Sequence, residues 1–150
     1  MDYFEQINAD LKTAMLAREA AKTETLRGIK KEFLEAKTAK DNPSGELPED
    51  KAIKILQKMV KQRKEAAEIY KTQGRQDLYD NEMLEAGYIE HYLPAQLSRE
   101  EIANAVRAAI AATGASSAQD MGKVMGVVSK QLAGKAEGKI ISEVVRELLS

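Results

Sequence analysis

The chain has 150 residues, of which 43% are hydrophobic and 31% are charged, and its formal net charge is −1. This length suits one compact unit or two small ones, with enough apolar residues for a core. The absence of Cys excludes a disulfide framework and thiol chemistry. Because the net charge is so small, no overall field draws the molecule to nucleic acid or to an anionic membrane, and such a partner must contact a local patch.

No run of 18 apolar residues is present, and the first ten residues lack a charged stretch followed by an apolar one. Such segments mark membrane-spanning helices and secretory signals. We therefore expect a cytoplasmic protein that has no membrane partner.

Apolar residues recur at helical spacing in four segments of the first 93 residues. They predict helices from about Asp2 to Ala21, from Thr23 to Lys37, from Pro48 to Gln73, and beyond Gly74 to about Leu93. Asp2 and Thr23 are placed to cap the first two helices. The turn formers of residues 41–48 predict a surface loop, and Gly74 is expected to end the third helix. Residues 1–93 are therefore interpreted as an array of helical hairpins.

One arginine lies on the apolar face of the third predicted helix, and two glutamates share the apolar side of the fourth. Arg63 and Glu85 are each eleven residues from Gly74, so they should meet if the helices fold back there. Glu82 takes that place if the register differs by about one turn. We predict a buried structural ion pair, because a neighbouring Arg63 would hold Glu85 ionised rather than prepare it for acid–base catalysis.

The last 53 residues predict three further helices, so the expected fold class is all-α with a small three-helix unit over residues 98–150. Ser98 and Glu101 form a capping box, and Gly114 is a C-cap. Ser116 or Ser117 should cap the next helix. Gly122 and Gly126 flank its apolar stripe at a cost of ~1 kcal/mol each, which predicts close packing against a neighbouring helix. The stripe itself consists of Met121, Val124, Met125, Val128 and Leu132.

Several short motifs, spread over the whole chain, are similar to those of a known family. They are KQR at 61–63, GR at 74–75, YLPAQLS at 92–98, DMGKVMG at 120–126 and GKAEG at 134–138. In type and order they resemble the YqeY family and the related tail domain in the B subunit of tRNA-dependent amidotransferases (the GatB/YqeY domain). One departure is Glu137, where many family members have Asp.

The resemblance implies a role in handling tRNA. In the amidotransferase the similar tail domain helps to hold the tRNA while the chemistry occurs in other domains, and a similar module is appended to some glutaminyl-tRNA synthetases. Family members are associated with carbon–nitrogen ligase activity that uses glutamine as amido donor, but this activity belongs to the assembled complex. The resemblance therefore implies no cofactor, ATP, glutamine or metal site in this chain.

The residues themselves also give little support to catalysis. His91 is the only histidine and there is no thiol, so no second His can complete a metal site or a Ser-His arrangement. Gly134-Lys135 is followed by Ala136 and lies between helices, which does not match a phosphate-binding loop. We expect an accessory protein rather than an enzyme.

A local basic face is the one sequence feature that favours nucleic acid. Residues 51–75 include eight basic and two acidic residues, and seven of the basic ones lie opposite the apolar face of the predicted helix. The alternative is an ordinary solvated face, partly neutralised by seven acidic residues in 76–101. The candidate RNA-binding residues are Lys54, Lys58, Lys61, Lys64, Lys123 and Lys135.

Two hypotheses on function follow. The first is a stand-alone, non-catalytic tRNA-binding accessory domain. The second is a protein–protein adaptor that docks on an aminoacyl-tRNA synthetase or an amidotransferase through its helical surface.

Overall fold

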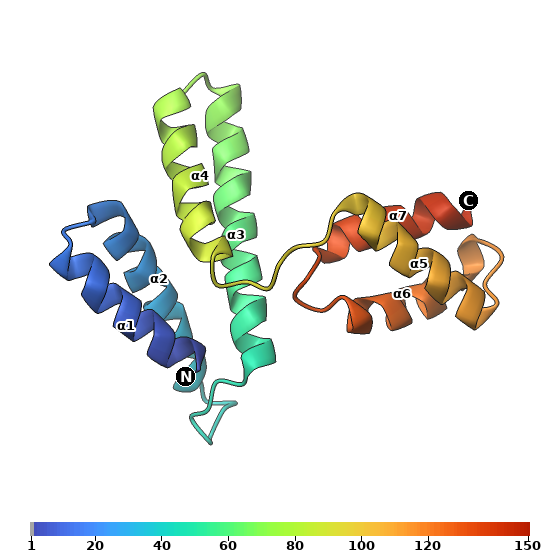
Figure 1. The fold of residues 1–150 in the computed structure, drawn as a ribbon, viewed down its shortest axis with the longest axis horizontal. Helices are drawn as coiled ribbons and strands as arrows, with labels where there is room; N and C mark the ends of the chain where they lie inside the picture. Colours follow the sequence, from blue (N-terminus) through green and yellow to red (C-terminus); the bar gives the residue numbers. More distant parts are fainter. Residues whose placement is uncertain (1) are drawn as a thin grey trace. The chain divides into compact units, whose positions relative to one another are not determined.

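The computed structural model describes residues 2–150, and in this range all regular structure is helical, which confirms the all-α prediction. The chain divides into two compact units, Met1–Leu93 and Pro94–Ser150. The first unit contains α1 (Tyr3–Leu16), α2 (Ala20–Lys37), α3 (Glu49–Thr72) and α4 (Gln76–Glu90). The second contains α5 (Arg99–Thr113), the short 3₁₀ helix η1 (Ala118–Asp120), α6 (Met121–Gln131) and α7 (Gly138–Leu149). Figure 1 shows the helices in chain order.

The first unit consists of two antiparallel helical hairpins, α1–α2 and α3–α4 (Figure 1). Its core is formed by apolar side chains from all four helices. The Tyr92 hydroxyl, just beyond α4, donates a hydrogen bond of 2.6 Å to Asp10 Oδ2 of α1. Burial, together with this hydrogen bond, raises the pKa of Tyr92. The core residues are Ile7, Leu11, Ala14, Leu26, Ile29, Phe33, Ala52, Leu56, Met59, Val60, Ile89 and Tyr92.

The first hairpin turns earlier than its sequence predicts. Asp2 caps α1 as expected, by accepting from the Glu5 N–H at 2.8 Å. The helix then ends at Leu16 rather than near Ala21, because Arg18 adopts φ of 58°, a left-handed conformation that breaks the helix without glycine or proline. The prediction that Thr23 caps α2 is wrong: this residue is buried inside the helix.

The second unit packs α5, α6 and α7 around a core of its own. The Ser98 cap is confirmed, since its hydroxyl accepts from the Glu101 N–H at 3.1 Å and the Glu101 side chain accepts from the Ser98 N–H. Gly114 ends α5 with φ of 70°. The buried side chains of this core are Ile102, Val106, Ala109, Val124, Val128, Leu132, Ala136, Ile141, Val144, Val145 and Leu149.

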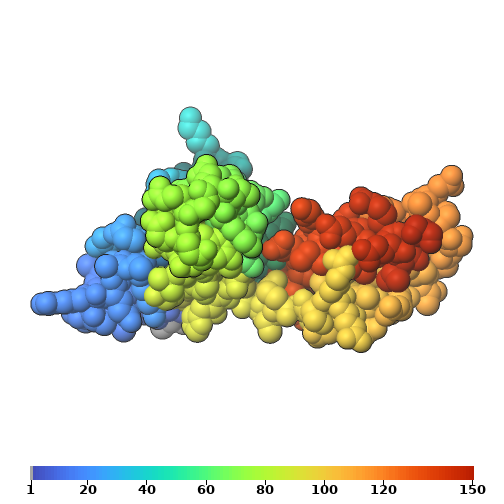
Figure 2. Space-filling view, turned by 90° about the horizontal axis from the view of Figure 1, so that it is seen from above, coloured from blue at the N-terminus to red at the C-terminus, as the bar shows by residue number. Residues whose placement is uncertain are grey.

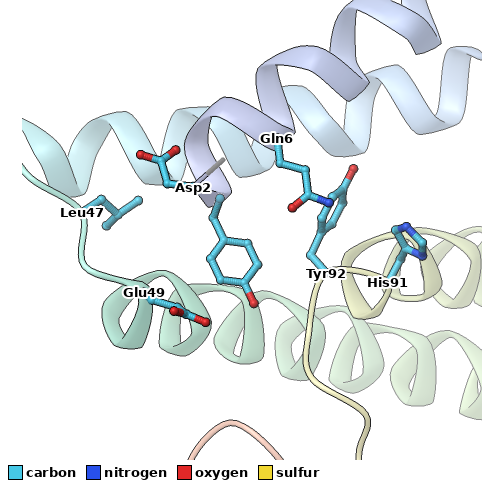
Figure 3. A pocket seen from close by; sticks show the side chains of 7 residues that line it. Asp2, Gln6, Leu47, Glu49, His91 and Tyr92 are labelled. Atoms are coloured by element: carbon cyan, nitrogen blue, oxygen red, sulfur yellow. The ribbon is translucent and has the colours of Figure 1, made fainter.

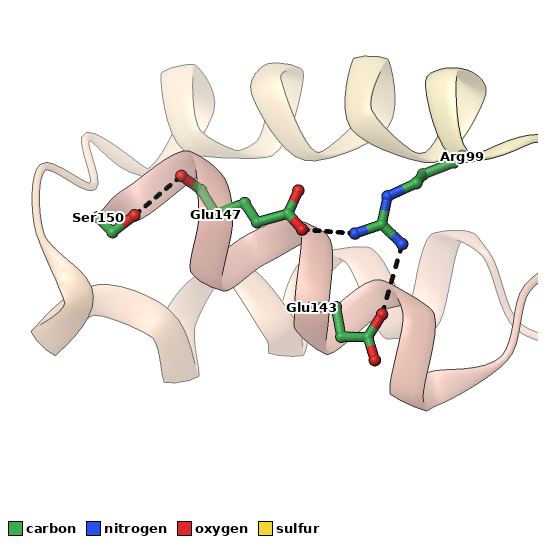
Figure 4. Close-up of polar contacts among 4 residues, drawn as sticks. All are labelled: Arg99, Glu143, Glu147 and Ser150. Carbon is green, nitrogen blue, oxygen red and sulfur yellow. Dashed lines mark hydrogen bonds and ion pairs between the residues drawn. The ribbon is translucent and has the colours of Figure 1, made fainter.

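Arg99 links the first turn of α5 to α7. Its Nη2 lies 2.6 Å from Glu147 Oε1, and its Nη1 lies 3.4 Å from Glu143 Oε2 (Figure 4). The hydrogen bonds to these two carboxylates raise the pKa of Arg99. All three side chains are substantially exposed, so the two pairs are expected to contribute little to stability.

The starts of α6 and α7 differ from the predicted caps. Neither Ser116 nor Ser117 caps α6, because η1 precedes it and the Asp120 carboxylate accepts from the Ser116 N–H at 3.0 Å. This hydrogen bond holds the pKa of Asp120 below its usual value. At α7, Glu137 occupies the N-cap position but its side chain makes no capping bond.

The side chain of Arg63, a residue of α3, points toward α4. Its Nη1 is 3.2 Å from Glu85 Oε2 and 3.4 Å from Glu82 Oε2, so the structure brings the three predicted residues together. The expectation that Arg63 is largely buried is wrong: 40% of its side chain is exposed, whereas Glu82 and Glu85 expose 13% and 16%. Val60, one turn earlier, is the last α3 residue that belongs to the core cluster of the first unit, although Ala67 is also buried.

Gly122 and Gly126 contradict the prediction of close packing. A Cβ atom added at either position would meet no neighbouring atom within 4 Å, and both residues are exposed. The physical reason is rotational. Two residues along a helix correspond to a turn of about 200°, so each glycine lies nearly opposite the buried valine two positions later, Val124 or Val128.

The first testable prediction concerns the ion pairs of Arg63. Replacing Arg63→Met leaves two poorly exposed carboxylates unpaired, and we expect the free energy of unfolding to fall by ~1–3 kcal/mol. This is less than for a fully buried pair, because water screens the exposed part of Arg63. Urea titration measures it. Arg27→Met is the matched control, since Arg27 pairs with Glu24 at an exposed site, and a change within ~0.5 kcal/mol is expected there. Equal effects of the two substitutions would contradict the prediction.

The second prediction concerns the α6 glycines. Gly122→Ala and Gly126→Ala should each raise the free energy of unfolding by ~0.4–1 kcal/mol, because alanine restricts the unfolded chain and the added methyl group meets open space. Gly114→Ala is the control of opposite sign: at φ of 70°, alanine should destabilise by ~1–2 kcal/mol. Thermal and urea unfolding distinguish the signs, and destabilisation by either α6 variant would disprove the open-space explanation.

Candidate nucleic-acid interface

Three lysines form a row on the solvent side of α3. Lys54, Lys58 and Lys61 are exposed and recur at intervals of four and three residues, which places them on one face of the helix. We call these three residues the lysine row. The rotation of α3 that turns the row outward is fixed by its buried side, which consists of Ala52, Leu56, Met59, Val60 and Ala67. No ion pair to the row is found within residues 2–150.

Lys64 does not belong to this row, although the sequence grouped it with the other three lysines. Its Nζ lies 2.7 Å from Glu90 Oε1, so its side chain points toward α4. Six residues after Lys58 the helix has turned by about 600°, which places Lys64 about 120° around the axis from Lys58 and beside the neighbouring helix. The carboxylate of Glu90 therefore neutralises the charge of Lys64.

The basic residues near the tip of the α3–α4 hairpin are also engaged. Lys71 Nζ lies 5.9 Å from the centre of the Tyr79 ring. Arg75 Nη2 lies 3.3 Å from Asp77 Oδ2, and the hydrogen bond between these groups holds the pKa of Asp77 below its usual value. The exposed residues Glu65 and Glu68 follow the lysine row on the same helix. The uncompensated positive face is therefore confined to the first half of α3.

The second unit carries the other two candidate lysines. Lys123 lies on α6 and Lys135 lies in the turn between α6 and α7, and both are exposed. The carbonyl oxygen of Lys135 accepts from the Leu97 N–H at 2.9 Å, which fixes this turn. Gly122 and Gly126 are exposed on α6 beside Lys123, and the space next to both glycines is open.

A polar pocket of about 350 Å³ lies in the first unit (Figure 3). Burial and the nearby charge of Glu49 raise the pKa of Tyr3. His91 packs edge-to-face against Tyr92, with ring centres 5.3 Å apart. The Asp2 carboxylate is occupied as the cap of α1. The lining residues are Asp2, Tyr3, Gln6, Leu47, Glu49, His91 and Tyr92.

The pocket contains the single histidine of the chain. His91 has no second histidine and no thiol beside it, since the chain contains one His and no Cys. Within the described part of the chain, no three His, Cys, Asp or Glu side chains are grouped so that they could hold a metal ion. Among residues 2–150, no helix has the length and apolar character needed to cross a membrane.

Comparison with known proteins agrees with the motifs in the sequence. The model of a family described as Yqey-like protein matches residues 4–149. The chain is also 36% identical over 87 residues to "Altered inheritance of mitochondria protein 41, mitochondrial" of Meyerozyma guilliermondii. That match spans 58% of this chain and 44% of the relative, so it covers less than half of the relative's length. Because the family model matches nearly the whole chain, the protein belongs to the YqeY family.

Proposed function

We propose that this protein is a stand-alone, non-catalytic accessory domain that binds tRNA, with the lysine row of α3 as its principal contact. The observation that carries this proposal is the row itself: Lys54, Lys58 and Lys61 are exposed on one face of a long helix and have no ion-pair partner within the described residues. The family resemblance adds a tRNA-handling role. The proposed location is the cytoplasm, whereas the printed name of the relative places that protein in mitochondria.

The geometry of the row suits a phosphate backbone. Lys54 and Lys61 are seven residue steps apart, or about 10 Å along the helix axis. Lysine ammonium groups are mobile donors that contact phosphates as point charges. Folded tRNA presents A-form stems whose deep, narrow major groove is not read by side chains. Residues 51–65, which include the row, contain no aromatic side chain on which unpaired bases could stack. We therefore infer binding by backbone shape and charge rather than by base sequence.

The two lysines of the second unit form a separate contact set in this proposal. Lys123 lies next to the exposed Gly122 of α6, and Lys135 lies in a turn held by hydrogen bonds. The proposal places no chemistry in this chain. Carbon–nitrogen ligation with glutamine as amido donor, to which the resemblance points, would be performed by the other components of an assembled complex.

An adaptor function is the second candidate, and α4 supplies a specific observation in its favour. Leu84 and Met83 expose 47% and 37% of their surfaces on the side of α4 that faces away from the core. Exposed apolar side chains on a helix can dock on a protein such as an aminoacyl-tRNA synthetase or an amidotransferase.

The test of the main proposal is a titration of fluorescently labelled tRNA at several salt concentrations. Phosphate contacts release counterions, so log K should fall linearly with log salt. Each of Lys54→Ala, Lys58→Ala and Lys61→Ala should reduce the slope by about one unit and should affect different tRNAs alike. Lys64→Ala is the matched control, because its charge is already neutralised by Glu90, and it should change the slope by less than half as much.

Two results would overturn this proposal. The first is the absence of binding at low salt. The second is unchanged binding when Lys54, Lys58 and Lys61 are replaced together by Glu. Either result would favour the adaptor function, in which Leu84→Ser weakens binding to a protein partner and salt has a small effect.

A further inference from the structure

The two units are joined by a short stretch of non-helical chain between α4 and α5. It consists of residues 91–98, which separate the two helices. In Figure 2 the yellow atoms of this part of the chain are visible at the surface of the molecule. The contacts made at its two ends decide which of its backbone bonds can turn.

The beginning of this stretch belongs to the first unit. Tyr92 is 6% exposed, and its hydroxyl donates to Asp10 Oδ2 at 2.6 Å. The Tyr92 N–H donates to the Ile89 carbonyl at 3.0 Å, and the Leu93 N–H donates to the Glu90 carbonyl at 3.0 Å. The side chain of Leu93 packs against the core of the first unit. The chain up to Leu93 therefore moves with that unit.

The end of the stretch belongs to the second unit. The Leu97 N–H donates to the Lys135 carbonyl at 2.9 Å, and the Leu97 side chain packs against the core of the second unit. Gln96 Nε2 donates to the Gly134 carbonyl at 2.9 Å. Both acceptors lie in the turn between α6 and α7. The chain from Gln96 onward therefore moves with the second unit.

Pro94 and Ala95 lie between these two anchored ends, and two features restrict them. The ring of Pro94 fixes its own φ at about −65° and disfavours the helical conformation for Leu93. Gln96 Nε2 donates not only to Gly134 but also to the Pro94 carbonyl, at 2.8 Å. The amide of Gln96 therefore holds the peptide group that follows Pro94 against the α6–α7 turn.

We propose that Pro94 and Ala95 form a stiffened hinge between the two units, and that the Gln96 side chain controls its stiffness. While the Gln96 amide bonds both carbonyls, rotation is concentrated in the bond between Cα and the carbonyl carbon of Pro94. When these bonds break, the two backbone torsions of Ala95 are released as well. Hinges of this kind consist of a few residues between rigid elements that absorb the change in backbone angles.

A freely flexible linker and a fixed joint fit these observations less well. Flexible linkers are rich in glycine and serine, whereas residues 91–98 contain no glycine and one serine, Ser98, which caps α5. A fixed joint requires anchoring bonds that run from one unit to the other. The anchoring hydrogen bonds of Tyr92 and Gln96 each remain within one unit.

The hinge also bears on the proposed function, and this consequence alone rests on that proposal. A single RNA that contacts the lysines of both units must fit the mutual orientations that the hinge permits. A stiff hinge reduces the number of these orientations, so less freedom is lost when the RNA binds.

The distribution of distances between two spin labels tests the hinge in the full chain. Because the chain has no Cys, only introduced cysteines are labelled. The pair between units is Glu68→Cys on α3 with Ala108→Cys on α5, both at exposed positions. Gln96→Glu removes the amide donors, and Pro94→Gly removes the ring. Each should widen this distribution by about twofold.

Matched controls separate the hinge from general effects. Gln131→Glu makes the same chemical change at an exposed position of α6, and Pro43→Gly replaces a proline in the loop before α3. Neither should change the width of the distribution between units. A second label pair, Lys12→Cys on α1 with Glu68→Cys on α3, lies within the first unit. Its distribution should be narrower and should be the same in every variant, which also checks that the fold is intact.

Three outcomes would overturn the proposal. The first is a distribution between units as narrow as that within the first unit, which means a fixed joint. The second is an unchanged width in both Gln96→Glu and Pro94→Gly, which means a linker that is already free. The third is an equal widening by the control substitutions. The measurement contains no RNA, so its result is independent of whether the protein binds tRNA.

Discussion

The rotation of α3 about its own axis is the constraint on which the arrangement of the first unit depends. Burial of Leu56 and Val60 at the core fixes that rotation, and burial of such side chains is worth ~1.5–3 kcal/mol each. Once this rotation is set, it determines whether each charged side chain of α3 points toward α4 or toward solvent. Arg63 faces the carboxylates of Glu82 and Glu85, while Lys54 and Lys58 face solvent.

This rotation also divides the charges of α3 into two zones. In the second half, α4 supplies Glu82, Glu85 and Glu90 to Arg63 and Lys64, so the positive charge is compensated within the hairpin. In the first half no acidic side chain of α4 pairs with the lysine row. A chain with a net charge of −1 can therefore have a positive face. The acidic residues of 76–101 therefore pair with basic residues in the second half of α3 and leave the lysine row in the first half unpaired.

The sequence predicted features that depend on neighbours along the chain. Ser98 caps α5 through a residue three positions away, and Gly114 and Gly74 adopt the left-handed conformation that glycine favours. The sequence did not predict features that depend on how the helices pack against one another. Arg18 takes φ of 58° without a glycine, because the turn between two packed helices requires that conformation.

In the candidate interface too, the sequence predicted what depends on the helical repeat and missed what depends on the packing of neighbouring helices. Periodicity placed Lys54, Lys58 and Lys61 on one face, since this follows from the helical repeat alone. Periodicity could not assign Lys64 to Glu90, because that pair depends on how closely α4 approaches α3. For Gly122 and Gly126, small size alone predicted a close neighbour, but a missing side chain permits an approach without causing one. In this structure the space beside both glycines is open.

The two candidate lysine sets belong to units with separate cores. In the described residues every fully buried side-chain nitrogen or oxygen has a hydrogen-bond partner. Neither core therefore contains an unsatisfied polar side chain. A ligand that reaches only one unit meets only one set of lysines. A ligand long enough to reach both gains the second contact as an intramolecular event, at an effective concentration set by the connection between the units. If both lysine sets bind RNA as proposed, a folded RNA should bind more tightly than a short oligonucleotide that reaches only one unit.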